Sequence, residues 1–372
     1  PRLRPRRTSG TVRSPCTILP SWSPTRAPTE RRIPRLRQHR QRGGEADQSQ
    51  KVYYVFGTQI AQAKSYDLIN WTAFESNLTN AENLVNIIPE SVRTHTGHNA
   101  DAEALKSNCW APDVIWNEAM GKWCMYLSVN GDMQRSVIVL LISDDLDGAW
   151  SYMGEVVYSR MDESAAGRAD YKKVTGEESV PGKYSAYRNS TNNLIYGVNA
   201  IDAAVTYDEN GDLWMSYGSW FGGIYMLKLD EATGLRDYTY QYKNVVKTAI
   251  GGEDFTGEIE NGQTFVVYSD AYLGLHIAGG AHANAGGEGS YFLKIGDWWY
   301  LFLSYGRYAP EGGYNMRVFR SATLTGFDAK GDFVGYKDAK DNYAVFSTGD
   351  ALIKADGEVG NRIMSGYTWS WW

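Results

Sequence analysis

Four short aromatic segments of one design recur along the chain, and they limit its fold more than any other feature. They are VYYVFGT from Val52, KWCMYLSVN from Lys122, LWMSYGSW from Leu213 and WWYLFLSYG from Trp298. A second strand-like run follows the last three, namely SVIVLLISDD, GGIYMLKLD and YNMRVFRSA. Aromatic and β-branched residues in short runs between turn signals are typical of antiparallel β-sheets.

The spacing of these segments predicts a propeller. Their starts lie 70, 91 and 85 residues apart, longer than the ~40–50 residues of common short propeller repeats but compatible with four strands and long loops per blade. Aligned as the inner strands of blades, the segments count four blades, and the chain ends at SGYTWSWW, where another is expected to begin. Helical periodicity is scarce, and TNAENLVNIIPESV is the best candidate for a short helix.

Charge and proline content separate the N-terminus from the rest. Residues 1–43 hold 12 Arg, no Lys and 7 of the 11 Pro, whereas the chain from Lys51 onward carries 25 basic and 40 acidic residues. An Arg-rich arm for nucleic acid or an acidic partner and a targeting peptide are two interpretations, although no apolar signal core is visible. We favour a disordered or non-native arm over residues 1–50 and a β-propeller domain over residues 51–372.

Composition excludes other classes. No run of 18 apolar residues exists, so no membrane span is expected, and we expect no nucleic-acid or membrane partner. The three cysteines, Cys16, Cys109 and Cys124, lack the spacing of a zinc site or a disulfide framework.

Three carboxylates hold corresponding positions in successive predicted blades. Asp113, Asp202 and Glu288 each stand near a hydrophobic strand, about ten residues before the aromatic segment of their own blade. A propeller gathers such positions around one axial cavity. A single Asp at a strand entry is more often bonded to backbone amides, and we expect that structural role for Asp113.

Four motifs in order resemble one family. WAPDVIWN, NAIDAAVTYDENGDLWMSYGSWFGGIYMLKLD, GGEGSYF and YAPEGGYNMRVFRS are similar to those of glycoside hydrolase family 43, most closely its arabinan-degrading branch, whose members are five-bladed β-propellers. The resemblance covers about residues 52 to 372. It implies an all-β, five-bladed propeller that is incomplete in the fifth blade, and inverting hydrolysis of α-1,5-linked L-arabinofuranosyl chains.

The resemblance implies roles for two acids. Glu288 would be the general acid that protonates the leaving glycosidic oxygen. Asp202 would be the auxiliary acid whose charge keeps the pKa of the general acid raised, because a neighbouring negative charge disfavours ionisation. Acid and base of an inverting pair stand roughly 6.5–9.5 Å apart, which leaves room for a water molecule.

The general base has no counterpart in the sequence. The family places it in a His-Asp-Pro type motif about ten residues before the segment matched by YYVFGT, where this chain reads HRQRGGEADQSQK. Neither Glu45 nor Asp47 has the expected neighbours, so the role is transferred to neither. The fifth blade normally supplies a His that helps bind an axial ion, often calcium; the chain shows no match to it, and its metal ligands stay unknown.

Three aromatic residues are candidates for stacking on a furanose ring: Trp110, Trp220 and Phe221. Core packing is an equal alternative for each. Arg317 and Arg320, on one strand, favour structural ion pairs over a pocket carboxylate. The acidic loop GGEDFTGEIENG lacks the spacing of a calcium loop and is expected to be solvated.

The leading functional expectation is a monomeric arabinan hydrolase that works outside the cytoplasm, extracellular or periplasmic. It needs no cofactor for its chemistry and is compatible with a structural calcium ion in the axial channel. One alternative is an arabinofuranosidase or xylosidase acting on arabinoxylan. Another is a non-catalytic sugar-binding propeller, because without a base hydrolysis would be weak or absent while sugar binding survives.

Overall fold

The computed structural model places the strands of the chain in successive antiparallel sheets. It describes residues 51–131, 134–161, 165–180, 198–219, 223–242, 269–278, 287–306, 314–337, 343–346 and 361–365. Residues 1–50, predicted to be an arm, lie outside this range, as does the loop 251–262.

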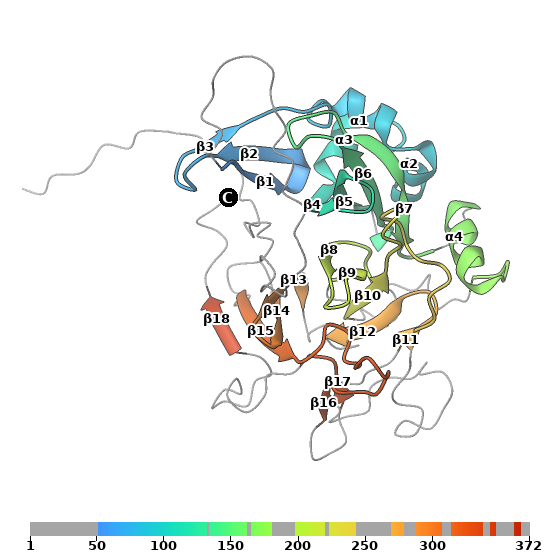
Figure 1. Ribbon diagram of the computed structural model, residues 1–372. Helices are drawn as coiled ribbons and strands as arrows, with labels where there is room; N and C mark the ends of the chain where they lie inside the picture. The colour runs from blue at the N-terminus through green and yellow to red at the C-terminus, as the bar shows by residue number, and fades with distance from the viewer. Residues whose placement is uncertain are drawn as a thin grey trace, which may run out of the picture.

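Four sheets of three to five strands follow one another around a ring (Figure 1). The first sheet contains β1 (Tyr53–Gly57), β2 (Ala61–Ser65) and β3 (Trp71–Ala73), and the second contains β4 (Cys109–Asn117), β5 (Lys122–Val129), β6 (Val137–Ser143) and β7 (Ser151–Tyr158). The third contains, in spatial order, β8 (Ala204–Tyr207), β9 (Leu213–Tyr217), β10 (Ile224–Lys228), β12 (Gly274–Ala278) and β11 (Ser269–Asp270). The fourth contains β13 (Glu288–Ile295), β14 (Trp298–Tyr305), β15 (Asn315–Ser321) and β18 (Asn361–Ser365). A two-stranded ribbon of β16 (Tyr336–Lys337) and β17 (Tyr343–Ala344) is separate.

The four aromatic segments are confirmed as the strands β1, β5, β9 and β14, each paired with the strand that follows it. Their expected place as inner strands is wrong for three blades. In these sheets another strand, β4, β8 or β13, precedes the aromatic strand and pairs with its other edge. We call β4, β8 and β13 the first strands. They contact each other from sheet to sheet, β4 with β8 and β8 with β13, so they line the middle of the ring.

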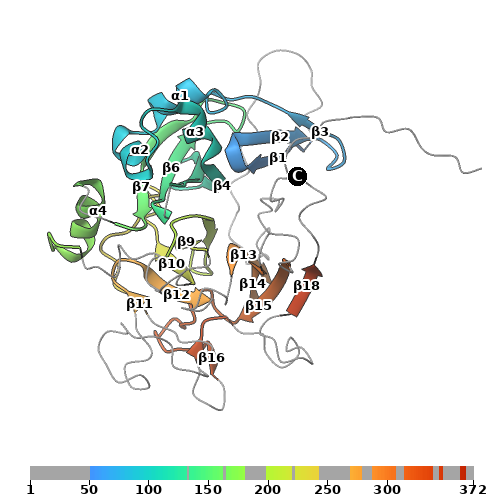
Figure 2. The same ribbon diagram turned by 180° about the vertical axis from the view of Figure 1, so that it is seen from behind.

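A 3₁₀ helix, η1 (Thr58–Ile60), and four short α-helices complete the described chain. The α-helices are α1 (Ala81–Ile87), α2 (Glu90–Thr96), α3 (Ala102–Ser107) and α4 (Ala165–Thr175). The segment predicted as one short helix is helical but is divided into α1 and α2 at Ile88 and Pro89. Asn80 caps α1 by accepting a hydrogen bond from the Asn83 amide, and Gly97 ends α2 in a left-handed conformation. Both views place α1 to α3 against the β4–β7 sheet and α4 at the outer margin of the ring (Figure 1, Figure 2).

The third sheet is buried on both faces, which explains its uninterrupted hydrophobic runs. Side chains of a strand alternate between faces. Leu213 and Met215 of β9 therefore join the core shared with the β4–β7 sheet, while Trp214 joins the core shared with the β13–β15 sheet. Packing on both sides fixes this sheet firmly between its neighbours.

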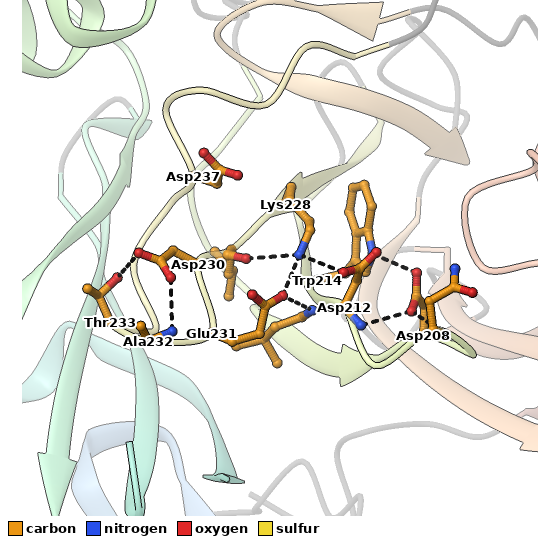
Figure 3. Close-up of polar contacts among 12 residues, drawn as sticks. Asp208, Asp212, Trp214, Lys228, Asp230, Glu231, Ala232, Thr233 and Asp237 are labelled. Carbon is orange, nitrogen blue, oxygen red and sulfur yellow. Dashed lines mark hydrogen bonds and ion pairs between the residues drawn. The ribbon is translucent and has the colours of Figure 1, made fainter. Parts of the chain in front are cut away.

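A buried lysine, Lys228, is the last residue of β10 and contacts two acidic side chains (Figure 3). The Nζ of Lys228, whose side chain is 9% exposed, contacts Glu231 Oε1 at 2.5 Å and Asp212 Oδ1 at 3.5 Å. It also donates to the Leu229 carbonyl. Glu231 Oε1 in turn accepts the Leu213 amide. Burial is the largest single effect on Glu231 and opposes its ionisation, but the hydrogen bonds from Lys228 and the backbone, together with the charge of Lys228, outweigh it and lower the pKa of that carboxyl.

Replacing Lys228 with Met should destabilise the fold. The change leaves Glu231 and Asp212 without their shared cation, but both are partly exposed, so we expect a loss of about 1–3 kcal/mol in the free energy of unfolding, less than for a fully buried pair. Denaturant titration measures it. Lys122→Met removes the exposed pair with Asp144 and should cost under about 1 kcal/mol. Equal losses of unfolding free energy in the two variants would contradict a larger stabilising role for the buried Lys228 than for the exposed Lys122.

Candidate active site

The two predicted acids, Asp202 and Glu288, meet where the first strands β8 and β13 begin. Asp202 lies two residues before β8, and Glu288 is the first residue of β13. Asp202 Oδ2 accepts a hydrogen bond of 3.1 Å from the Gly289 amide, next to Glu288. Ser216 and Ser290 share a hydrogen bond of 2.7 Å that joins the same two sheets. The structure therefore brings together the two residues that the sequence analysis assigned to the chemistry.

A strained backbone and a neighbouring blade fix Asp202. Its φ of +57° is a left-handed conformation that a residue other than glycine seldom adopts. The Asp202 amide donates to Ser128 Oγ of β5 at 3.1 Å. The second sheet thus holds the backbone of Asp202, and the fourth sheet holds its carboxyl group.

Two hydroxyl groups hold the carboxyl group of Glu288. Ser219 Oγ donates to Oε2 at 3.0 Å, and the Tyr314 hydroxyl donates to Oε1 at 2.5 Å. Glu288 stands between Gly287 and Gly289, whose φ angles of +119° and +60° are accessible to glycine. Glycines at these positions allow the backbone turn that points the charge between the sheets.

The electrostatics of the pair favour one shared proton. Burial and, second, the charge of Glu288 raise the pKa of Asp202 to about 7, although the Gly289 amide works against this shift. Two close carboxyl groups cannot both ionise without a large cost. Near neutral pH the pair therefore keeps a proton that an ordinary aspartate would have lost.

Asp113 stands apart from this pair. Its Oδ2 accepts the Val205 amide of β8 at 2.6 Å, so it joins the first strands of the second and third sheets. Burial raises the pKa of Asp113 to about 6 against the opposing bonds from Val205 and Val114. This contact is the structural one expected from the sequence.

The aromatic candidates are only partly described. Trp110 is half-buried on β4, and its indole donates to the Ser107 carbonyl at 3.0 Å, so a stacking role stays a prediction. Trp220 and Phe221 lie outside the described residues, as do Glu45 and Asp47. The guanidinium groups of Arg317 and Arg320 lie over the rings of Tyr305 and Trp298, 4.5 and 4.4 Å from their centroids.

Sequence reasoning missed Ser219 and Tyr314. Both lie in motifs that the analysis quoted, Ser219 in SYGSW and Tyr314 in GGYNMRVFRS. Pattern alone could not single them out, because their contacts with Glu288 span 69 and 26 residues of chain. The pairing of β13, β14 and β15 makes Tyr314 a neighbour of Glu288, and the contact between the third and fourth sheets does so for Ser219.

No metal centre is visible in the part of the chain that the structure describes. Nowhere in it do three or more His, Cys, Asp or Glu side chains gather as metal ligands. These residues do not fit the axial ion suggested by the resemblance, and no step below uses one. Within the same residues, no helix has the length and apolar character needed to cross a bilayer.

Curated relatives of the chain are arabinan-degrading enzymes. It is 30% identical over 315 residues to an extracellular endo-α-(1→5)-L-arabinanase of Thermotoga petrophila, a match that covers 83% of the chain and 56% of the relative. It is 29% identical to the extracellular endo-α-(1→5)-L-arabinanase 2 of Bacillus subtilis, over 76% of the chain and 48% of that relative. The chain thus spans about half the length of the curated relatives it matches. No family model matches it.

The chain is also similar to solved structures of arabinan-degrading enzymes and of family 43 glycoside hydrolases. A glycoside hydrolase of family 43 from Bacillus licheniformis matches with a TM-score of 0.51 and 28% identity, over 84% of this chain and 57% of that one. The Thermotoga petrophila endo-1,5-α-L-arabinanase in complex with TRIS matches with a TM-score of 0.51 and 29% identity, over 83% and 59%. The fold is therefore the five-bladed β-propeller that the sequence predicted, and the described residues supply four of its sheets.

Replacing Asp202 with Asn should change the pH dependence of stability. A carboxyl group whose pKa rises from 3.8 to about 7 on folding destabilises the fold as the pH climbs through that window. Asp202→Asn removes this cost, so its free energy of unfolding relative to wild type should improve by roughly 4 kcal/mol between pH 4 and pH 8. Denaturant titration at both pH values measures it, with Asp297→Asn, in the turn after β13, as control. A difference independent of pH would contradict the raised pKa.

Proposed function

The chain belongs to glycoside hydrolase family 43, and we propose that it hydrolyses α-1,5-linked L-arabinan with inversion at the anomeric carbon. The observation that carries the proposal is the Asp202–Glu288 pair, which retains one proton near neutral pH at the start of two first strands. The names of the relatives support the substrate.

The geometry of the pair supports distinct roles for its members. Glu288 donates its proton to the glycosidic oxygen, whose bond to the anomeric carbon then breaks. Asp202, held by Ser128 and the Gly289 amide, shares the retained proton of the pair with Glu288, because two close carboxyl groups cannot both ionise without a large cost. A general acid needs a proton at the working pH and a fixed position near the leaving oxygen.

Inversion also requires a base that activates water on the opposite face of the sugar. In the last three sheets, a first strand precedes the aromatic strand. The described part of the first sheet begins with its aromatic strand β1, so the corresponding position precedes residue 51, outside the described residues. We assign the base to no residue.

The remaining parts of the proposal follow from the chemistry. Acid–base hydrolysis of a glycoside uses no organic cofactor, and an axial calcium ion would have a structural role. Both named relatives are described as extracellular, which supports action outside the cytoplasm on plant cell-wall arabinan by a monomer. Trp110, Trp220 and Phe221 are the proposed stacking residues for furanose rings.

Glu288→Gln tests the proposal. It keeps the size of the side chain but cannot donate the acidic proton, so we expect kcat on linear arabinan to fall by about 10²–10⁴-fold. Reducing-end release measures the rate, and early proton NMR spectra should show the inverted anomer as the first product. The exposed Glu103→Gln should keep wild-type activity.

Arabinan binding without product release by the wild type would instead favour a sugar-binding propeller. A product with retained configuration would overturn the inverting mechanism.

A further inference from the structure

Tyr314 contacts Glu288 from the beginning of β15, which β14 separates from β13 in the same sheet. It lies directly before β15, and its hydroxyl donates to Glu288 Oε1 at 2.5 Å. The Ser304 side chain hydrogen-bonds the Tyr314 hydroxyl. Ser304 is also the register partner of Glu288 in the β13–β14 ladder. Three neighbouring strands thus bring Ser304, Tyr314 and Glu288 into one chain of hydrogen bonds.

The Tyr314 hydroxyl remains a donor throughout the working pH range. Burial, then the charge of Glu288 and the hydrogen bond to it, raise the pKa of Tyr314 well above its usual value. The hydroxyl therefore keeps its proton, and its bond to Ser304 restricts its rotation. A serine hydroxyl such as that of Ser219 can rotate to donate or accept as the state of its partner changes.

We propose that Tyr314 is a positioning residue that fixes the carboxyl group of Glu288 by occupying Oε1, so that Oε2 carries the transferable proton. This inference rests on the proposed hydrolase function. The proton passes from Oε2 to the glycosidic oxygen, and the electrons of the broken C–O bond stay with that oxygen. Ser219 accepts from protonated Oε2 before the transfer and donates to it afterwards, which is the arrangement in the structure.

Two alternatives differ from this proposal in measurable ways. If Tyr314 were only a packing residue, removing its hydroxyl would leave both the rate and the titration of the pair unchanged. If it contacted substrate directly, its removal would raise KM. A positioning role lowers kcat and leaves KM almost unchanged, because the misplaced acid protonates the leaving group less effectively.

The kinetic test compares Tyr314→Phe with Tyr300→Phe, a matched control that removes a hydroxyl four positions from Ser304 on β14. We expect Tyr314→Phe to lower kcat on linear arabinan by about 10–100-fold with KM changed less than about threefold. On a dinitrophenyl α-L-arabinofuranoside, whose leaving group needs little protonation, the loss should shrink to about threefold or less. Tyr300→Phe should stay within about twofold of wild type on both substrates. Equal losses on the two substrates, or none, would overturn the proposal.

A second measurement does not depend on activity. In protein labelled with ¹³C at the tyrosine ζ carbons, the signal missing from Tyr314→Phe identifies Tyr314. We expect this signal to shift as the Asp202–Glu288 pair titrates and to lose that shift in Glu288→Gln. If the Tyr314 signal responds to pH in Glu288→Gln as it does in the wild type, the positioning role is overturned, whether or not the wild type cleaves arabinan. A responding signal in a protein that cleaves neither substrate supports the Tyr314 contact and overturns the hydrolase function alone.

Discussion

The repulsion between the carboxyl groups of Asp202 and Glu288 is the interaction on which the site depends. In water two such groups would both ionise at neutral pH. Between the sheets, burial and mutual charge keep one proton on the pair, and the pKa of Asp202 rises to about 7. The same burial and repulsion that cost folding energy supply an acid at the pH where the glycosidic oxygen must be protonated.

Contacts from several sheets hold the pair in place despite this cost. The third sheet, packed on both faces, places Ser216 against Ser290 and presents Asp202 beside the Gly289 amide. Asp113 ties β8 to the second sheet through the Val205 amide. Hydroxyl groups then orient Glu288 from two sides. Glu288 is the first residue of β13, and its contacts come from residues within two positions of the ends of β8, β9 and β15. Strand ends therefore set the described contacts of the acid, as expected of a site that must hold its geometry closely.

Much of this arrangement follows from the sequence. Alternation and turn signals predicted the aromatic strands, and their repetition predicted a propeller with Asp202 and Glu288 at equivalent positions of successive blades. The place of the first strands was missed because the order of strands within a sheet is set by pairing, which the sequence pattern of a single strand does not record. Ser219 and Ser128 were missed because their roles come from contacts between sheets, and Tyr314 because it reaches Glu288 across β14 of its own sheet. Such contacts depend on register and packing, which no local pattern records.

The protonation state of Asp202 tests most directly the claim that the Asp202–Glu288 pair keeps one proton near neutral pH. Carbon-13 NMR of the aspartate carboxyl groups, with Asp202→Asn to assign the signal, reports its ionisation as the pH changes. The account predicts that Asp202 is still largely protonated at pH 6, that it titrates with a midpoint near 7, and that the midpoint falls in Glu288→Gln. An Asp202 that is fully ionised at pH 5, or a midpoint unaffected by Glu288→Gln, would contradict it.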